Sequence, residues 1–204
     1  KTAMEFAPSD PVAQIIARLA GRTARDFPHF AILAGNPAVA GQRFVVLVLN
    51  EADRPVAVLK TGLGESAHSL IRHERGFLRS VAAGTPGVPR LIAELDTGRV
   101  QGFAVEFFDG YSPSAADQAG PLLQGWLNRG RQVQLRDLAC WQRLQQAVKG
   151  DALFRKLADQ LELRPIRPTL YHGDLAPWNV RIANGTWTVL DWERGELAGP
   201  PGWD

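Results

Sequence analysis

The sequence YHGDLAPWNV, residues 171–180, places polar side chains inside a run that otherwise suits a protein core. These side chains are His172, Asp174 and Asn179. A buried polar group without a partner costs about 1–3 kcal/mol. We therefore expect these residues either to be hydrogen-bonded to their neighbours or to bind a ligand.

The next residues predict a β-hairpin. WNVRIANGTWTVLDW, residues 178–192, has Asn184–Gly185 between two strand-like runs, which is the strongest short hairpin signal. A two-residue turn there places Asn179 opposite Leu190, next to Asp191. Strict strand alternation would put Asn179 and Asp191 on opposite faces. We therefore expect regular strand geometry to end at Asn179.

Two carboxylates and an amide then meet at the open end of this hairpin. Asp174, Asn179 and Asp191 supply the hard oxygen ligands that suit Mg²⁺. The alternative is that the three residues cap turns, which Asp and Asn often do.

A second pair of charged residues lies nearer the N-terminus. Glu74 falls in the middle of the apolar stripe of a helix predicted over residues 66–83. An unpaired carboxylate there is costly, and Lys60, at the end of the apolar strand PVAVLK, is its candidate partner. Alternatively, Glu74 lies at the edge of the stripe and Lys60 extends to solvent. The stripe consists of Leu70, Ile71, Phe77, Leu78 and Val81.

Composition limits the class of protein. The 204 residues are 45% hydrophobic and 22% charged, and 23 basic residues face 21 acidic ones. This balance implies neither a nucleic-acid partner nor a membrane surface, and no apolar run is long enough to span a bilayer. The single cysteine, Cys140, excludes an internal disulfide and fits a reducing compartment, so we expect the cytoplasm. Residues 73–77, HERGF, do not form the zinc-binding HExxH pattern.

The chain is organised as a β-rich half followed by a helical half, so we predict an α+β fold. The expected N-terminal lobe is residues 1–106 and the C-terminal lobe is residues 107–204, and ligands often bind between such halves. The predicted helices are residues 11–20, 66–83, 134–148 and 151–163. The predicted strands are residues 30–35, 43–50, 55–60 and 102–108, in addition to the hairpin.

These residues together resemble a known family. AVLK with Lys60, Glu74, HGDLAPWN and VLDWE are similar in order and spacing to the small-molecule branch of the protein-kinase-like fold. That branch includes the aminoglycoside phosphotransferases and choline kinases, and the resemblance covers about residues 30–204. It implies a two-lobe fold with a mainly helical C-terminal lobe, which would be truncated here.

The resemblance also implies roles for individual residues. Asp174 would be the catalytic aspartate that orients or deprotonates the acceptor hydroxyl. Asn179 and Asp191 would hold the Mg²⁺ ions that bridge the phosphates. Lys60 would contact the α- and β-phosphates of ATP while Glu74 holds it in place. His172 would orient the loop without taking part in the chemistry.

Two further segments would contact the nucleotide. Gly35 to Gly41 lies where the family's phosphate-covering loop falls, although it does not have the GxGxxG pattern. The backbone near Glu106–Phe108 would hydrogen-bond the purine. The phenylalanines of that segment could equally be core residues.

Departures from protein kinases favour a small acceptor. Gly173 replaces the arginine of the HRD motif, and Trp192–Glu193 replaces Phe-Gly after the metal-binding aspartate. Only 13 residues follow Asp191 in this sequence, so we expect no activation segment.

The sequence therefore predicts an ATP-dependent phosphotransferase that moves the γ-phosphate to a hydroxyl of a small molecule. The alternative function is a pseudokinase, a nucleotide-binding or interaction module without turnover. Residues 129–167 contain nine basic and four acidic side chains. These belong either to a solvated helix face or to a site for an acceptor that carries phosphate or carboxylate.

Overall fold

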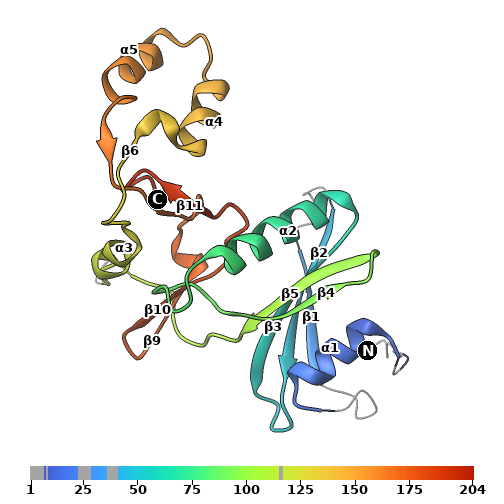
Figure 1. Cartoon of the computed structure of the whole chain (residues 1–204). Helices are drawn as coiled ribbons and strands as arrows, with labels where there is room; N and C mark the ends of the chain where they lie inside the picture. Colours follow the sequence, from blue (N-terminus) through green and yellow to red (C-terminus); the bar gives the residue numbers. More distant parts are fainter. Residues whose placement is uncertain (1–6, 8, 23–28, 36–40, 115–116) are drawn as a thin grey trace. The chain divides into compact units, whose positions relative to one another are not determined.

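The computed structural model describes residues 7, 9–22, 29–35, 41–114 and 117–204 (Figure 1). It divides into two compact units. The first comprises Lys1–Arg79 and Pro89–Asp109, and the second Ser80–Val88 and Gly110–Asp204. Sheets and helices are mixed, which confirms the predicted α+β class. In the described part of the chain, no helix has both the length and the apolar character needed to cross a bilayer.

The first unit is built on a five-stranded antiparallel sheet with the strand order β1-β2-β3-β5-β4. The sequence pattern does not predict strand β4, because Glu94 interrupts its apolar residues. Arg75 and Arg79 both form ion pairs with Glu94, so this carboxylate is compensated. The strands are β1 (Phe30–Ala34), β2 (Gln42–Leu49), β3 (Pro55–Leu63), β4 (Leu91–Asp96) and β5 (Val100–Glu106).

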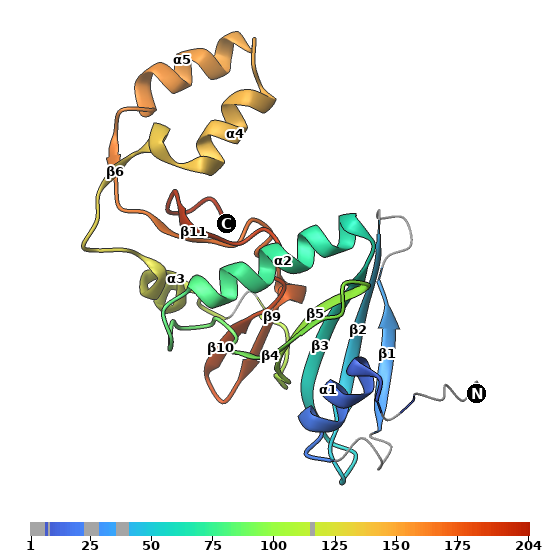
Figure 2. The same ribbon diagram turned by 45° about the vertical axis from the view of Figure 1, so that its right-hand side comes forward.

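Helix α1 (Pro11–Leu19) covers one face of this sheet (Figure 2). The Asp10 side chain caps the helix by accepting hydrogen bonds from the N–H groups of Val12 and Ala13. Ile15 and Ile16 pack against a buried cluster from four strands: Val46, Val48, Ala57, Leu59, Ala93, Leu95 and Ala104. Since side chains alternate along a strand, Lys60 projects from the face of the sheet opposite to that of Leu59, which belongs to this core.

Helix α2 (Glu65–Ser80) packs closely against the sheet at its first turn. A Cβ atom on Gly62 would lie 2.9 Å from the Cβ of Ala67, and one on Gly41 would lie 2.7 Å from the Ala67 nitrogen. Gly41 also has a φ of +88°, a conformation that glycine adopts without strain. These two glycines therefore permit the approach of α2 to β2 and β3.

The second unit contains three helices and three two-stranded sheets among the described residues. The helices are α3 (Gly120–Trp126), α4 (Ala139–Ala147) and α5 (Ala152–Leu161). The sheets pair β6 (Val133–Gln134) with β7 (Pro165–Ile166), β8 (Thr169–Tyr171) with β11 (Glu196–Gly199), and β9 (Val180–Ala183) with β10 (Thr186–Val189).

The helix predicted over residues 134–148 begins later than expected. Residues 133–134 pair with β7, and Leu135–Asp137 forms a 3₁₀ turn in which Asp137 accepts a hydrogen bond from the Gln134 N–H. Strand pairing and this local cap therefore replace the first helical turn, and α4 starts at Ala139. Asp151 caps α5 by accepting a hydrogen bond from the Phe154 N–H at 2.8 Å.

Candidate functional site

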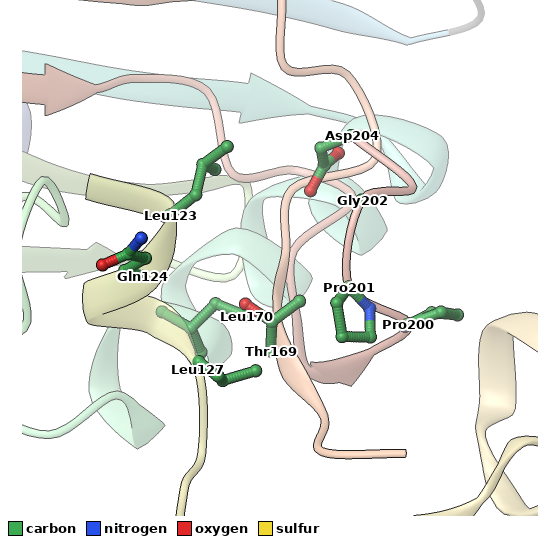
Figure 3. Close-up of a pocket in the computed structure, with 9 residues that line it drawn as sticks. All are labelled: Leu123, Gln124, Leu127, Thr169, Leu170, Pro200, Pro201, Gly202 and Asp204. Carbon is green, nitrogen blue, oxygen red and sulfur yellow. The ribbon is translucent and has the colours of Figure 1, made fainter. Parts of the chain in front are cut away.

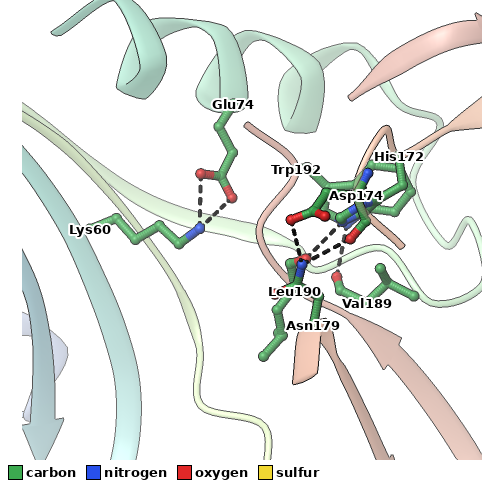
Figure 4. Close-up of polar contacts among 8 residues, drawn as sticks. All are labelled: Lys60, Glu74, His172, Asp174, Asn179, Val189, Leu190 and Trp192. Carbon is green, nitrogen blue, oxygen red and sulfur yellow. Dashed lines mark hydrogen bonds and ion pairs between the residues drawn. The ribbon is translucent and has the colours of Figure 1, made fainter. Parts of the chain in front are cut away.

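The first unit contains the predicted ion pair between Lys60 and Glu74 (Figure 4). The Lys60 Nζ lies 2.7 Å from Oε1 and 2.9 Å from Oε2 of Glu74. The Glu74 side chain is only 6% exposed, and that of Lys60 is 20% exposed. The prediction that the two residues pair is therefore confirmed, and the alternative that Lys60 simply extends to solvent is wrong.

The position of Glu74 follows from the apolar stripe of α2. Ile71, Phe77 and Leu78 are buried one turn before and after it. A carboxylate at this position is stable only when it is compensated, because taking an ionised group out of water costs several kcal/mol. The ammonium of Lys60 supplies that compensation, and it also lies 6.0 Å from the centre of the Phe103 ring.

Lys60 lies on a face of the sheet where several apolar side chains are partly exposed. Strand pairing aligns Leu33, Val45, Lys60 and Phe103 in one row, and Leu47, Val58 and Val105 in the next. Residues opposite each other in paired strands share a face. Leu33 is 60% exposed, and Val45 and Val58 are partly exposed. The first unit therefore presents apolar side chains beside a buried ion pair.

The predicted phosphate-covering segment is only partly described. Gly35 donates its N–H to the Arg43 carbonyl at 2.8 Å, which continues the pairing of β1 with β2. Gly41 lies at the start of β2, against Ala67 of α2. Residues 36–40 lie outside the described residues. A phosphate-binding role for Gly35 and Gly41 stays a prediction.

The predicted purine-binding backbone follows the end of β5. Glu106 is exposed and its carboxylate forms an ion pair with Arg90 at 2.6 Å. The Phe107 N–H donates to the Val56 carbonyl at 3.1 Å, so the strand ladder continues one residue further. Phe108 is half-buried. The contact of this backbone with a nucleotide also stays a prediction.

In the second unit, the hairpin has the predicted register. Val180 pairs with Val189 and Ala183 with Thr186, around a turn in which Asn184 and Gly185 have φ values of 50° and 75°. Positive φ at both positions is the mark of a type I′ turn. One step beyond the strands, the Leu190 N–H donates to the Asn179 carbonyl at 2.7 Å.

Asn179 ends a 3₁₀ turn, Pro177–Asn179, so the chain leaves strand geometry there as predicted. The residue is 8% exposed. Its side-chain nitrogen donates to the Asp174 carbonyl at 2.9 Å and to the Asp174 Oδ2 at 3.3 Å. The amide nitrogen is thus directed at Asp174, which leaves the amide oxygen as the atom that could ligate a cation.

His172 is fully buried and holds this loop in place (Figure 4). Its Nε2 lies 2.8 Å from the Leu190 carbonyl oxygen, and its Nδ1 lies 3.2 Å from the Asp174 backbone nitrogen. A carbonyl can only accept and an N–H can only donate, so the imidazole is neutral with its proton on Nε2. Both nitrogens are used within the protein, which supports an orienting role.

The His172 ring packs against a buried tryptophan, which in turn packs against a second one. The His172 and Trp192 rings are 4.6 Å apart and the Trp192 and Trp126 rings 5.2 Å apart, both edge to face. The indole N–H of Trp192 donates to the Val189 carbonyl, and that of Trp126 to the Pro86 carbonyl. The rings bury a large apolar area while each polar N–H keeps a partner.

Asp204 makes a contact that the sequence analysis did not assign. Its carboxylate accepts the backbone N–H groups of His172 and Gly173, each at 2.7 Å. Asp204 also lines a cavity of about 200 Å³ with residues from α3 and β8 (Figure 3). The cavity is mostly apolar and smaller than the roughly 300–1,000 Å³ usual for a small-molecule site. A bond across 32 residues has no local sequence signal.

Asp191 adopts a φ of 66°, in the left-handed region. This conformation costs about 1–2 kcal/mol for a residue other than glycine, and such strain is often found at functional sites. Asp191 directly follows Leu190, whose N–H bonds Asn179. In the described part of the chain no three His, Cys, Asp or Glu side chains form a cluster that could hold a metal ion. Mg²⁺ needs fewer protein ligands when phosphate oxygens complete its shell, and the carboxylate of Asp191 and the amide oxygen of Asn179 are of the type it prefers. That they hold this ion stays a prediction.

Part of the chain is similar to a known protein family. The model of the phosphotransferase enzyme family matches residues 108–204. No curated protein matches the chain by sequence.

The structural neighbours are small-molecule kinases. A ternary complex of a thermostable aminoglycoside phosphotransferase APH(4)-Ia mutant with ADP and hygromycin B is 13% identical, with a TM-score of 0.50 over 91% of this chain and 72% of that one. A candidate fructosamine-3-kinase from Haemophilus somnus 129PT is 12% identical, with a TM-score of 0.54 over 94% of this chain and 71% of that one. Identities this low establish the fold alone.

The resemblance inferred from the sequence is thereby confirmed: the chain has the kinase-like fold of the small-molecule kinases. The match to the phosphotransferase enzyme family lies in the second half of the chain, and the solved structures extend the likeness of fold to most of its length.

The role of His172 leads to a prediction about stability. His172→Phe preserves an aromatic ring but leaves the Leu190 carbonyl and the Asp174 N–H without their partner. We expect the free energy of unfolding to fall by about 1–3 kcal/mol for each group. Urea denaturation measures this change. His73→Phe, at an exposed position of α2, is the control and should change stability by less than about 0.5 kcal/mol. Equal effects of the two substitutions would contradict the orienting role.

Proposed function

We propose that this protein is an ATP-dependent, Mg²⁺-requiring kinase that transfers the γ-phosphate to a hydroxyl of a small molecule. The observation that supports this most strongly is the hairpin end. There the Asn179 side chain bonds Asp174, and the Asn179 carbonyl bonds the residue before Asp191. Two carboxylates and one amide thus come from one short stretch of chain.

The first unit supplies groups suited to ATP. Lys60 would neutralise charge on the α- and β-phosphates, and the two bonds from its ammonium to Glu74 fix its direction. The half-covered apolar rows that include Leu33 and Val58 suit the flat face of a purine. The backbone of Glu106 and Phe108 would provide its hydrogen bonds.

Asn179 and Asp191 would hold Mg²⁺ through the amide oxygen and the carboxylate. When bound, this ion neutralises charge on the phosphate oxygens and fixes their direction. The structural contribution of the chain is to direct the two ligands. The bonds from Asn179 to Asp174 would orient the amide, and Asp191 would present its carboxylate from a left-handed backbone.

Asp174 would act on the acceptor. It orients the hydroxyl and takes its proton while the hydroxyl oxygen bonds to the γ-phosphorus. The bond between that phosphorus and the bridging oxygen of ADP breaks, and ADP leaves with the electron pair. Asp174 is exposed, so its carboxylate is accessible to a substrate.

The short segment after Asp191 favours a small-molecule acceptor over a protein substrate. Glu196 of β11 already pairs with Tyr171 of β8, just before the catalytic loop. Five residues therefore carry the chain from Asp191 into a strand beside that loop. A segment this short cannot form the extended loop on which protein kinases bind a peptide.

The first test concerns nucleotide binding. At a nucleotide concentration about 100 times the dissociation constant, ATP with Mg²⁺ should stabilise the protein by about 2.7 kcal/mol. For a chain of this length that raises the melting temperature by about 5–10 °C. Asp191→Ala should remove most of the Mg²⁺-dependent part of the shift, measured by thermal denaturation. The control is Asp159→Ala, at an exposed position of α5. An undiminished shift in Asp191→Ala would show that Asp191 is not a metal ligand.

A second prediction separates Asp174 from Asn179. Asp174→Asn should leave the nucleotide dissociation constant nearly unchanged and lower turnover by about 10²-fold or more, because it removes only the acceptor-side base. Asn179→Ala should weaken nucleotide affinity and Mg²⁺ dependence together. Slow hydrolysis of ATP by water can be followed before the acceptor is known. If Asp174→Asn abolished nucleotide binding and left hydrolysis per bound ATP unchanged, the catalytic assignment of Asp174 would be wrong.

The same assay distinguishes a kinase from a pseudokinase. A kinase consumes ATP in the presence of a suitable small hydroxyl compound, and Asp174→Asn lowers that consumption by about 10²-fold or more. Binding of ATP with no consumption across a broad panel of such compounds would favour the pseudokinase.

A further inference from the structure

The segment that follows the predicted purine contact joins the hairpin of β9 and β10. Tyr111 forms a bridge with Ile182 of β9, with an N–H to carbonyl bond in each direction at 3.1 and 2.9 Å. Gly110 precedes this bridge with a φ of 120°, and a Cβ atom there would lie 2.4 Å from the Ile182 carbonyl oxygen. The backbones are therefore in direct contact, and only glycine fits at residue 110.

Arg181 connects the same two segments through its side chain. It lies on β9 between the buried residues Val180 and Ile182 and is itself half-buried. Its Nη1 lies 3.1 Å from the Ser112 Oγ, 3.1 Å from the Trp178 carbonyl oxygen and 2.8 Å from the Val180 carbonyl oxygen. One guanidinium nitrogen thus contacts the chain at three points.

Two of these contacts lie on either side of Asn179. Trp178 is the residue before it and Val180 the residue after it. The Trp178 carbonyl belongs to the peptide group that joins Trp178 to Asn179, so a hydrogen bond from a charged donor restricts rotation of the backbone directly before Asn179. The Val180 carbonyl belongs to the peptide group between Val180 and Arg181, and the Asn179 carbonyl itself accepts the Leu190 N–H. The direction of the Asn179 side chain depends on the peptide group before its Cα, which Arg181 holds.

Ser112, the third residue that Arg181 contacts, lies in a segment with its own local hydrogen bonds. The Asp117 carboxylate accepts hydrogen bonds from the N–H and hydroxyl of Ser114 and from the Tyr111 hydroxyl. The Ser114 backbone and hydroxyl hold the pKa of Asp117 below its ordinary value, so this carboxylate is ionised at neutral pH. Ser112 therefore lies within a short segment fixed at Tyr111 and at Ser114.

We propose that Arg181 is a positioning residue for Asn179, and that through Ser112 it ties Asn179 to the segment after the purine contact. The proposal rests on the proposed function of Asn179 as a metal ligand. It assigns Arg181 no contact with the substrate. Residues that orient a metal ligand typically change metal affinity by about 10–100-fold when they are replaced.

Arginine is suited to this task and lysine is not. The planar guanidinium offers several N–H groups in fixed directions, whereas an ammonium is a compact charge on a flexible stem. A merely structural arginine would affect stability and leave the response to Mg²⁺ unchanged. A positioning arginine should affect the response to Mg²⁺ even where the fold is intact.

The test compares ADP binding with and without Mg²⁺ by isothermal titration calorimetry. In the wild type, we expect MgCl₂ to tighten ADP binding relative to the same buffer with EDTA. Arg181→Met and Arg181→Lys should each lose about tenfold or more of this gain. Their affinity for ADP without Mg²⁺ should stay within about twofold of the wild type, since Arg181 acts through Asn179 alone. Ser112→Ala should reduce the gain in the same direction, but less.

Arg167→Met is the matched control, because Arg167 is exposed between β7 and β8. It should leave both dissociation constants unchanged. Circular dichroism checks folding, and Arg181→Lys retains the charge if Arg181→Met does not fold. A full wild-type gain in Arg181→Lys, or an equal loss of affinity with and without Mg²⁺, would overturn the positioning role alone. No Mg²⁺-dependent gain in the wild type would overturn the proposed function, and this proposal with it.

Discussion

The hydrogen bond from the Leu190 N–H to the Asn179 carbonyl is the interaction on which the candidate site depends. It extends the register of β9 and β10 by one step beyond the strands and places Asp191 beside Asn179. A slip of one residue would turn every side chain of a strand to the other face. The turn at Asn184 and Gly185, with positive φ at both residues, fixes this register.

The loop before the hairpin is held by a network in which the backbone N–H and both ring nitrogens of His172 have partners. Asp204 accepts its backbone N–H, Leu190 accepts its Nε2 proton, and its Nδ1 accepts the Asp174 N–H. Beneath it, Trp192 and Trp126 supply the apolar area. Asp174 is thus an exposed carboxylate on a rigid base, which is the arrangement that positioning of a substrate hydroxyl requires.

Much of this could be predicted from the sequence, because the relevant signals are local. The Asn-Gly turn fixes the hairpin, and the apolar stripe of α2 isolates Glu74 and so predicts its pairing with Lys60. Contacts between distant residues have no such signal. The bonds from Asp204 to His172 and Gly173 and from Arg181 to Ser112 span 31–32 and 69 residues. The sequence pattern does not indicate strand β4, because Glu94 interrupts it and the arginines that compensate this carboxylate, Arg75 and Arg79, belong to helix α2.

The central claim is that Asn179 and Asp191 direct a divalent ion to the phosphates of a bound nucleotide. The most direct measurement is a crystal structure of the protein with Mn²⁺ and a non-hydrolysable ATP analogue, with the ion located by its anomalous scattering. The account predicts an anomalous peak bonded to the Asn179 amide oxygen, the Asp191 carboxylate and the phosphate oxygens, with Lys60 on the same phosphates. A nucleotide bound with its ion away from both Asn179 and Asp191 would contradict it.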